Sequence, residues 1–158
     1  MVDMRVITAP ESLDRQPIET AIFLAGSIEM GTAENWQLKV INLIRKIPNN
    51  KNIVVYNPRR RDWDNSWKQS IKNPKFKEQV EWELDAIGDA DFILMYFDPN
   101  TKSPITLLEL GLNVHKWYRF FVCCPEGFWK KGNVDIVCEK YNIKQVDTIK
   151  ELVEKSIG

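Results

Sequence analysis

Apolar and polar residues follow one another along this chain in blocks that predict strands and helices in turn. Four short apolar runs are rich in β-branched and aromatic residues, which is typical of buried strands. They span residues 20–26, 52–57, 91–97 and 119–125. Apolar residues recur at helical spacing over residues 36–47, 76–87 and 103–117. Continuously apolar strands that alternate with helices predict a doubly wound α/β fold, a parallel sheet with helices on both faces.

The two ends of the chain carry weaker patterns. Residues 4–17 are expected to form an extended lead-in. After the last of the four strands we expect a helix over residues 134–141, a short edge segment near Val146 and an amphipathic helix from Thr148. Since no repeat, low-complexity tract or long linker interrupts the sequence, residues 1–158 are expected to be a single domain.

Polar loops follow the predicted strands at the edge where an open parallel sheet binds its ligands. The loop over residues 57–74 is longer than a connection between a strand and a helix requires. Loops of this length are usually functional or disordered, and Trp63 and Trp67 argue against disorder. The sequence therefore indicates a binding loop at this edge.

Two glutamates lie beside the apolar stripes of the predicted helices. These stripes comprise Phe76, Val80, Leu84 and Ile87 on one helix, and Ile105, Leu108 and Leu112 on the next. Glu83 lies at the edge of the first stripe and Glu109 flanks the second. A carboxylate on a packed face is costly unless it is hydrogen-bonded or its pKa is shifted, so both are candidates for a site. The alternative is a helix-edge glutamate whose head group reaches water.

Ser103 and Pro104 explain why the helix that carries Glu109 begins where it does. The serine side chain is expected to accept hydrogen bonds from free backbone N–H groups, and proline suits the first helical position. This structural role is sufficient to account for Ser103. Because the start of this helix faces the expected ligand crevice, Glu109 can approach the crevice.

The composition narrows the function further. Lysine plus arginine and aspartate plus glutamate both number 22, so no basic field favours nucleic acid or an anionic membrane, and a small, locally bound partner is expected. No apolar run approaches a signal core or a membrane helix, so we expect a soluble, cytoplasmic protein. The 3 cysteines lack CxxC spacing and are interpreted as buried small hydrophobes. His115, the only histidine, has no nucleophile placed beside it, which excludes serine and cysteine triads.

Three strings occur in an order that resembles the nucleoside 2-deoxyribosyltransferase family: "FLAGSI", "WELDAIGDADFILMYF" and "SPITLLELGL". The resemblance is strongest to a branch of short sequences with an "NPRR.DW" loop, and extends from about Ala21 to Asn133. It implies a flavodoxin-like core and an enzyme that cleaves the N-glycosidic bond of nucleosides. It also implies that Glu109, the glutamate of "ELG", is the nucleophile. Neither a cofactor nor a metal ion is expected.

Four positions depart from the family pattern. Glu83 stands where relatives have an aspartate that helps to protonate the leaving base or to hold the sugar. Ser103 stands where transferases often carry aspartate and related deoxynucleotide hydrolases carry serine, which leaves both transfer and hydrolysis open. Phe23 replaces a tyrosine that steadies the nucleophile in many relatives, so another donor must serve. Glu29 replaces an arginine that helps to bind phosphate in relatives acting on nucleoside 5′-monophosphates, and its charge would repel phosphate, which favours free nucleosides.

The reaction implied by this resemblance is attack of Glu109 on C1′ of a 2′-deoxynucleoside. The product is a glycosyl-enzyme ester, which a second base cleaves in a transferase and water cleaves in a hydrolase. The proton for the leaving base is expected from either Glu83 or Asp62. Arg59, Arg60, Arg61 and Lys102 could still supply cations for a phosphate from another side.

The loop after the second predicted strand is expected to recognise the base, with polar groups of Asn57, Arg59 and Arg60 at its edge and Trp63 stacked on its face. The alternative is an arginine–aspartate cluster that only orders the loop. Asn133 is expected to enter the active site of a neighbouring subunit, which requires a homo-oligomer; alternatively it is a helix residue without a ligand. The positions expected to contact the substrate are Phe23, Gly26, Ser27, Asn57, Arg59, Arg60, Trp63, Ser103 and Asn133.

Other classes of function fit the sequence less well. No P-loop is present, and "AGSIEMG" lacks the further glycines of a dinucleotide site. A non-catalytic nucleoside or nucleotide sensor on the same fold is the main rival, although a binder gains little from two costly carboxylates. Binding of single-stranded nucleic acid by the tryptophans of the long loop is weakened by the acidic residues and balanced charge.

Overall fold

A computed structural model describes residues 4–28, 34–48 and 50–158 of the chain. Over this part of the chain, parallel strands form a 6-stranded sheet in the order β1-β3-β2-β4-β5-β6. The strands are β1 (Arg5–Thr8), β2 (Thr20–Gly26), β3 (Ile53–Asn57), β4 (Phe92–Tyr96), β5 (Phe120–Cys123) and β6 (Lys144–Val146). The helices are α1 (Trp36–Arg45), α2 (Pro74–Asp89), α3 (Pro104–Leu112), α4 (Lys131–Lys140) and α5 (Ile149–Ser156), with 3-10 turns η2 (Asn50–Asn52) and η3 (Val114–Arg119).

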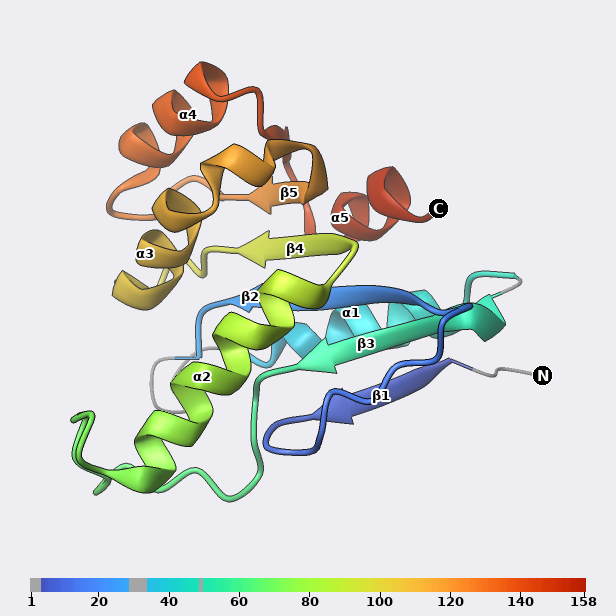
Figure 1. The fold of residues 1–158 in the computed structure, drawn as a ribbon. Coiled ribbons are helices and arrows are strands. Elements are labelled where there is room, and N and C mark those ends of the chain that lie inside the picture. Colours follow the sequence, from blue (N-terminus) through green and yellow to red (C-terminus); the bar gives the residue numbers. More distant parts are fainter. Residues whose placement is uncertain (1–3, 29–33, 49) are drawn as a thin grey trace.

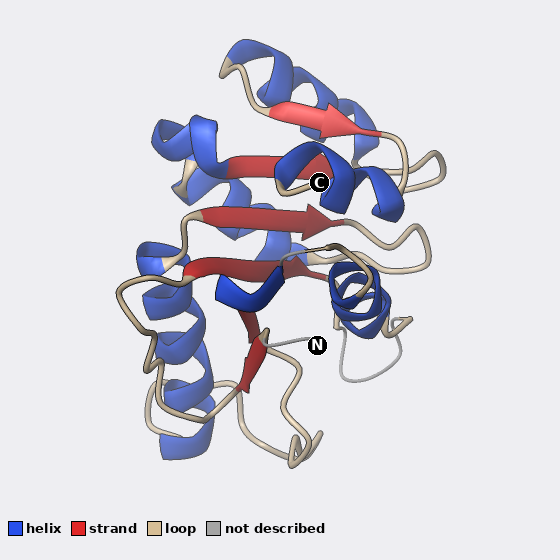
Figure 2. Ribbon diagram, turned by 90° about the vertical axis from the view of Figure 1, so that its right-hand side faces the viewer, coloured by secondary structure: helices blue, strands red, loops and turns tan. Residues whose placement is uncertain are grey.

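Helices cover both faces of the sheet, as the alternating pattern predicts (Figures 1 and 2). One hydrophobic core joins the sheet to α2, α3 and α4, and the other joins it to α1 and α5. The strand order from β3 to β6 is that of flavodoxin-like folds, and β1 extends it at one edge. The doubly wound, flavodoxin-like prediction is therefore confirmed.

The N-terminal segment corrects the expectation of an extended lead-in. Residues of β1 pair in parallel with β3, from Arg5 opposite Val54 to Thr8 opposite Asn57. Only Ile7 of this strand is buried, so an edge strand this short leaves little pattern in the sequence. The later elements agree with the expectations for the tail: β6 contains Val146, and Thr148 caps α5 by accepting from the Glu151 N–H.

Most residues of the apolar stripes expected on α2 and α3 do not pack on the sheet, which is a second correction; Ile87 is buried as expected. The exposed residues include Val80 and Leu84 on α2 and Ile105, Leu108 and Leu112 on α3. The buried residues are Gln79, Trp82, Ala86 and Ile87 on α2 and Thr106, Glu109 and Leu110 on α3. Both helices carry apolar residues on two faces, so helical spacing alone could not identify the packed one. As a consequence, polar residues lie on the packed face.

The connections after β2 and β4 leave the sheet in opposite directions. β2 leads to α1 on one face, and its neighbour β4 leads to α3 on the other. This is the topological switch point, where ligands bind beyond the carboxyl ends of strands in open α/β sheets. At the end of β2, a Cβ on Gly26 would lie 2.5 Å from both a ring carbon of Trp36 and the Tyr96 carbonyl oxygen. Any side chain at this position would clash with these atoms, so the close packing here requires glycine.

All three cysteines are buried, as interpreted from the sequence, and burial raises the pKa of each thiol: Cys123 to about 11, and Cys124 and Cys138 to about 12. They behave as core residues rather than as nucleophiles. Among the helices described, none is long and apolar enough to cross a membrane.

Candidate active site

Hydroxyl groups from two loops meet at the switch point. Ser27 directly follows β2, and Thr101 and Ser103 follow β4. Thr101 Oγ1 lies 3.1 Å from Ser27 Oγ and 2.7 Å from Ser103 Oγ, and the two serine hydroxyls are hydrogen-bonded to each other. All three side chains are buried, so the cluster fastens the start of α3 to the end of β2.

Asp98 is a functional candidate that the sequence analysis missed. Its backbone N–H donates to Ser27 Oγ at 3.0 Å. Its carboxylate accepts from the backbone N–H of Glu34 at 3.1 Å and of Asn100 at 2.9 Å. An aspartate that directly follows a buried strand and precedes Pro99 is a turn signal that could have identified it. Asp98 joins the two loops that form the crevice.

Ser103 corrects the expectation of a capping side chain. It occupies the N-cap position of α3, but its side chain makes no capping hydrogen bond and instead contacts Ser27 and Thr101. Its backbone is left-handed, with φ of 47°, which costs a non-glycine residue roughly 1–2 kcal/mol. Strain of this kind is typical of functional sites, and here it accompanies the contacts of the hydroxyl with Ser27 and Thr101.

Glu109 lies on the buried side of α3, little more than one turn from its start, and is 5% exposed. Burial and the negative charge of Glu83 both raise the pKa of Glu109 well above its usual value. Pro104 begins the helix as expected, and Asn113 fastens its far end by donating to the Glu109 carbonyl oxygen at 2.8 Å. The carboxyl group is therefore carried on a fixed element.

Glu83 approaches Glu109 from the neighbouring helix α2. Burial raises the pKa of Glu83 to about 7, although a hydrogen bond from Gln79 acts in the opposite direction. The two glutamates are close enough for the charge of one to raise the pKa of the other. Glu109 is buried and Glu83 is half-buried, so the two glutamates meet across the gap between α2 and α3 instead of flanking two separate packed stripes.

The loop after β3 is ordered by Arg60, whose side chain is 1% exposed. The guanidinium donates to both carboxylate oxygens of Asp62, at 2.7 and 3.1 Å, and to Glu78 at 3.2 Å. It also lies 5.1 Å from the centre of the Trp67 ring, which packs against Trp63. These are the contacts of the arginine–aspartate cluster left open as an alternative.

Asp62 is less suited than Glu83 to donate a proton. Its side chain is exposed, and the hydrogen bonds from Arg60 lower its pKa. A carboxylate whose pKa is lowered is ionised at neutral pH and has no proton to give. Glu83 and Asp62 are the two acids considered from the sequence. The surroundings of Glu83 favour its protonated form, whereas those of Asp62 favour its ionised form.

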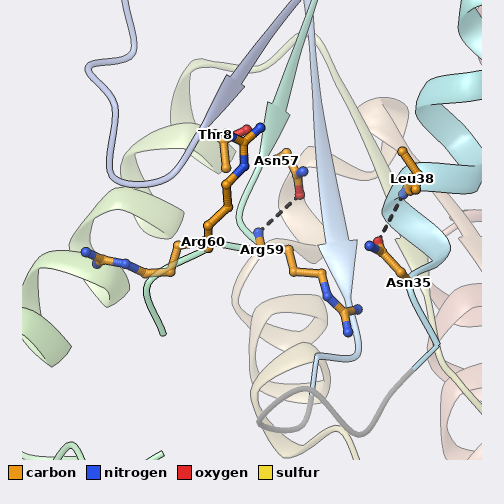
Figure 3. A pocket seen from close by; sticks show the side chains of 7 residues that line it. Thr8, Asn35, Leu38, Asn57, Arg59 and Arg60 are labelled. Carbon is orange, nitrogen blue, oxygen red and sulfur yellow. Dashed lines mark hydrogen bonds between the residues drawn. The ribbon is translucent and has the colours of Figure 1, made fainter. Parts of the chain in front are cut away.

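Arg59 points from the end of β3 toward the start of α1 (Figure 3). Its Nη1 donates to the Glu34 carbonyl oxygen at 3.2 Å and to Gln37 Oε1 at 3.3 Å. A pocket of about 310 Å³ lies here, lined by Thr8, Asn35, Leu38, Asn57, Arg59, Arg60 and Arg61. Neither Glu83 nor Glu109 lines it, so this pocket does not contain the carboxylate pair.

The remaining predicted positions are dispersed. Phe23 is fully buried in the core with its ring centre 6.4 Å from that of Trp82, so the expected contact with substrate has no exposed surface to use. Asn133 is exposed in the first turn of α4. Glu29 lies outside the described residues.

Among the described residues, no group of three or more histidine, cysteine, aspartate or glutamate side chains could hold a metal ion.

Comparison with known proteins agrees with this geometry. A solved structure, "Crystal structure of conserved protein from Enterococcus faecalis V583", shares the fold with a TM-score of 0.59 and 15% identity, covering 86% of this chain and 96% of that chain. No curated protein matches the chain. The family model described as "Nucleoside 2-deoxyribosyltransferase like" matches residues 19–128, from β2 to the loop after β5. Because this match covers well over half of the sequence, the chain belongs to the nucleoside 2-deoxyribosyltransferase-like family.

Proposed function

We propose that this protein, acting as a single domain, is a nucleoside 2-deoxyribosyltransferase that moves deoxyribose from one base to another through a glycosyl ester on Glu109. The observation that carries this proposal is the pair of carboxyl groups at the switch point. Each is on a separate helix, and the pKa of each is raised. Carboxyl groups that repel each other's charge titrate as a pair, and the reactive form in this proposal is the one in which Glu109 is ionised and Glu83 carries the proton.

In the first half of the reaction, a Glu109 carboxylate oxygen bonds to C1′ while the bond from C1′ to the base nitrogen breaks. The electron pair of that bond goes to the base, which takes the proton of Glu83. In the second half, a nitrogen of another base bonds to C1′, the ester bond to Glu109 breaks, and the N–H proton of the incoming base returns to Glu83. Proton transfer of this kind contributes about 10²- to 10⁴-fold to the rate.

The crevice offers groups for both parts of the substrate. We assign contacts with the sugar to Ser27 and Ser103, whose hydroxyls meet at the switch point beside Gly26. We assign base recognition to Asn57, Arg59 and Trp63 at the rim of the loop. Arg60 then keeps this loop in place, because its hydrogen bonds are already used within the protein.

A second copy of the chain is proposed to cover the exposed apolar residues of α2 and α3. Leu84, Ile105, Leu108 and Leu112 are between 44 and 62% exposed on the helices that carry the two glutamates. Exposed apolar residues gathered on neighbouring helices are typical of protein interfaces. A partner on this surface would bury these apolar residues, and Asn133 of that partner could complete the site.

The test is incubation of the protein with each 2′-deoxynucleoside, with and without a second free base, with the products separated by chromatography. We expect a new nucleoside only when the acceptor base is present. Glu109→Gln keeps the size of the side chain and should lower the rate at least about 10³-fold, because it removes the nucleophile. The glycosyl ester on Glu109 should be detectable by mass spectrometry after rapid denaturation.

Other results would redirect the assignment. Free base released at an unchanged rate without an acceptor would make the protein a hydrolase, the outcome that Ser103 leaves open. Deoxynucleoside 5′-monophosphates belong in the same assay, since arginines line the pocket at the end of β3. If the folded wild type binds nucleosides but forms no product from any of them, the catalytic proposal is refuted in favour of a sensor.

A further inference from the structure

Gln79 is a buried polar residue on α2, one helical turn before Glu83. Its Oε1 accepts a hydrogen bond from Arg60 Nη1 at 3.5 Å, and its Nε2 donates to the Pro58 carbonyl oxygen at 2.9 Å. A guanidinium group only donates and a carbonyl only accepts, so these contacts fix the orientation of the amide. Gln79 is thereby held at both ends by the loop after β3.

The Gln79 amide lies beside Glu83, because residues four apart lie on the same side of a helix. Its bond to Pro58 uses one of the two N–H groups of this amide. Burial raises the pKa of Glu83 and the hydrogen bond from Gln79 lowers it, so that the balance is a pKa of about 7. Without a donor, burial would keep Glu83 protonated over a wider range of pH.

We propose that Gln79 is a positioning residue that orients the Glu83 carboxyl group beside Glu109 and allows it both to give and to regain a proton. This inference rests on the proposed function, in which Glu83 protonates one base and deprotonates the next. A group does both efficiently only when its pKa is near the working pH. The loop that is proposed to bind the base also holds Gln79, through Arg60 and Pro58.

The charges around Glu83 are few. From α3 the facing group is Glu109, whose pKa Glu83 raises. From the loop after β3, Arg60 lies on the far side of Gln79 and is already paired with Asp62 and Glu78. Within the described part of the chain, the Gln79 amide is thus the group whose replacement should change the titration of Glu83 most directly.

The test combines NMR titration with pH–rate profiles for the wild type, Gln79→Leu and Gln79→Glu. Glutamate carboxyl carbons are labelled with carbon-13, and the Glu83 signal is assigned by its loss in Glu83→Gln. We expect the pKa of Glu83 to rise by about one unit in Gln79→Leu, and further in Gln79→Glu, where the new carboxylate adds a like charge. The limb of the pH–rate profile that reports the titration of Glu83 should move to higher pH as well. Glu78→Gln, which removes only an exposed partner of Arg60, should leave the titration of Glu83 unchanged.

The two proposals fail in different ways. Gln79→Glu keeps the size of the side chain and an acceptor for Arg60, so it tests the inference even if Gln79→Leu does not fold. If the Glu83 signal titrates as in the wild type in a folded Gln79 variant, the positioning role is refuted whatever the activity. A wild type that neither transfers nor hydrolyses deoxyribose refutes the proposed function, and with it the catalytic meaning of the Gln79 contact.

Discussion

Replacing Glu83 with glutamine is expected to stabilise the fold at neutral pH and to leave its stability nearly unchanged in acid. In the unfolded chain this carboxyl group has its ordinary pKa of 4.5, whereas in the folded protein the pKa is about 7. The folded state therefore binds more protons between pH 4.5 and 7, and the wild-type free energy of unfolding falls as pH rises through this range. Below this range both states are protonated and no difference remains.

The magnitude follows from the size of the shift. Each pKa unit corresponds to 1.36 kcal/mol, so the rise from 4.5 to about 7 costs the wild type about 3 kcal/mol above neutral pH. Glutamine carries no charge, and its amide oxygen can still accept the hydrogen bond from Gln79. The difference in free energy of unfolding between Glu83→Gln and wild type should thus grow from near zero at pH 4 to about 3 kcal/mol at pH 8.

The assay is urea denaturation followed by circular dichroism at intervals between pH 4 and pH 8, with free energies from linear extrapolation. Glu81→Gln is the matched control, because Glu81 is exposed on the same helix. The control should differ from the wild type by a constant amount at every pH. A difference between Glu83→Gln and wild type that also stays constant would refute the view that Glu83 is held protonated by burial.

Two further predictions concern packing and assembly. Gly26→Ala should destabilise the protein by about 1–3 kcal/mol in the same denaturation assay, since the new Cβ would meet Trp36 and the backbone. Gly88 has open space around it, so Gly88→Ala should not destabilise the protein. An equal loss of stability in both variants would contradict the steric argument. Leu108→Glu should reduce the mass measured by light scattering to that of a monomer, whereas the same change at the exposed Ile18 should not; an unchanged mass for both would exclude this surface as the interface.

The sequence predicts the strands well because they are buried on both faces. In β2 every residue from Ala21 to Ala25 is buried, so apolar character is continuous and the strand bounds follow directly from it. The edge strand β1 buries only Ile7 and gives no such signal. Pairing of β1 with β3 depends on contacts between residues about fifty positions apart, which no local pattern records.

The site is only partly predictable, because its polar residues replace apolar ones on the packed side of two helices. Periodicity identified the apolar rows that contain Leu84 and Leu108, but these rows face outward. Glu83 and Glu109 were recognised as unusual, whereas Gln79 was missed because a glutamine in a helix has no distinctive pattern. Its role becomes visible only when the loop after β3 places Arg60 and Pro58 against it.

The inverted arrangement of α2 and α3 bears on the choice between an enzyme and a sensor. Each helix turns Glu83 or Glu109 toward the protein interior and leaves leucines exposed, which is unfavourable for a monomer on both counts. A second copy on the exposed side would remove the penalty for the exposed leucines. The cost of turning two glutamates toward the protein interior remains. Catalysis requires this cost, since a carboxyl group whose pKa is raised toward neutrality can transfer a proton. A protein that only binds nucleosides would gain stability from two glutamines at these positions, so the retention of both glutamates favours chemistry at this site.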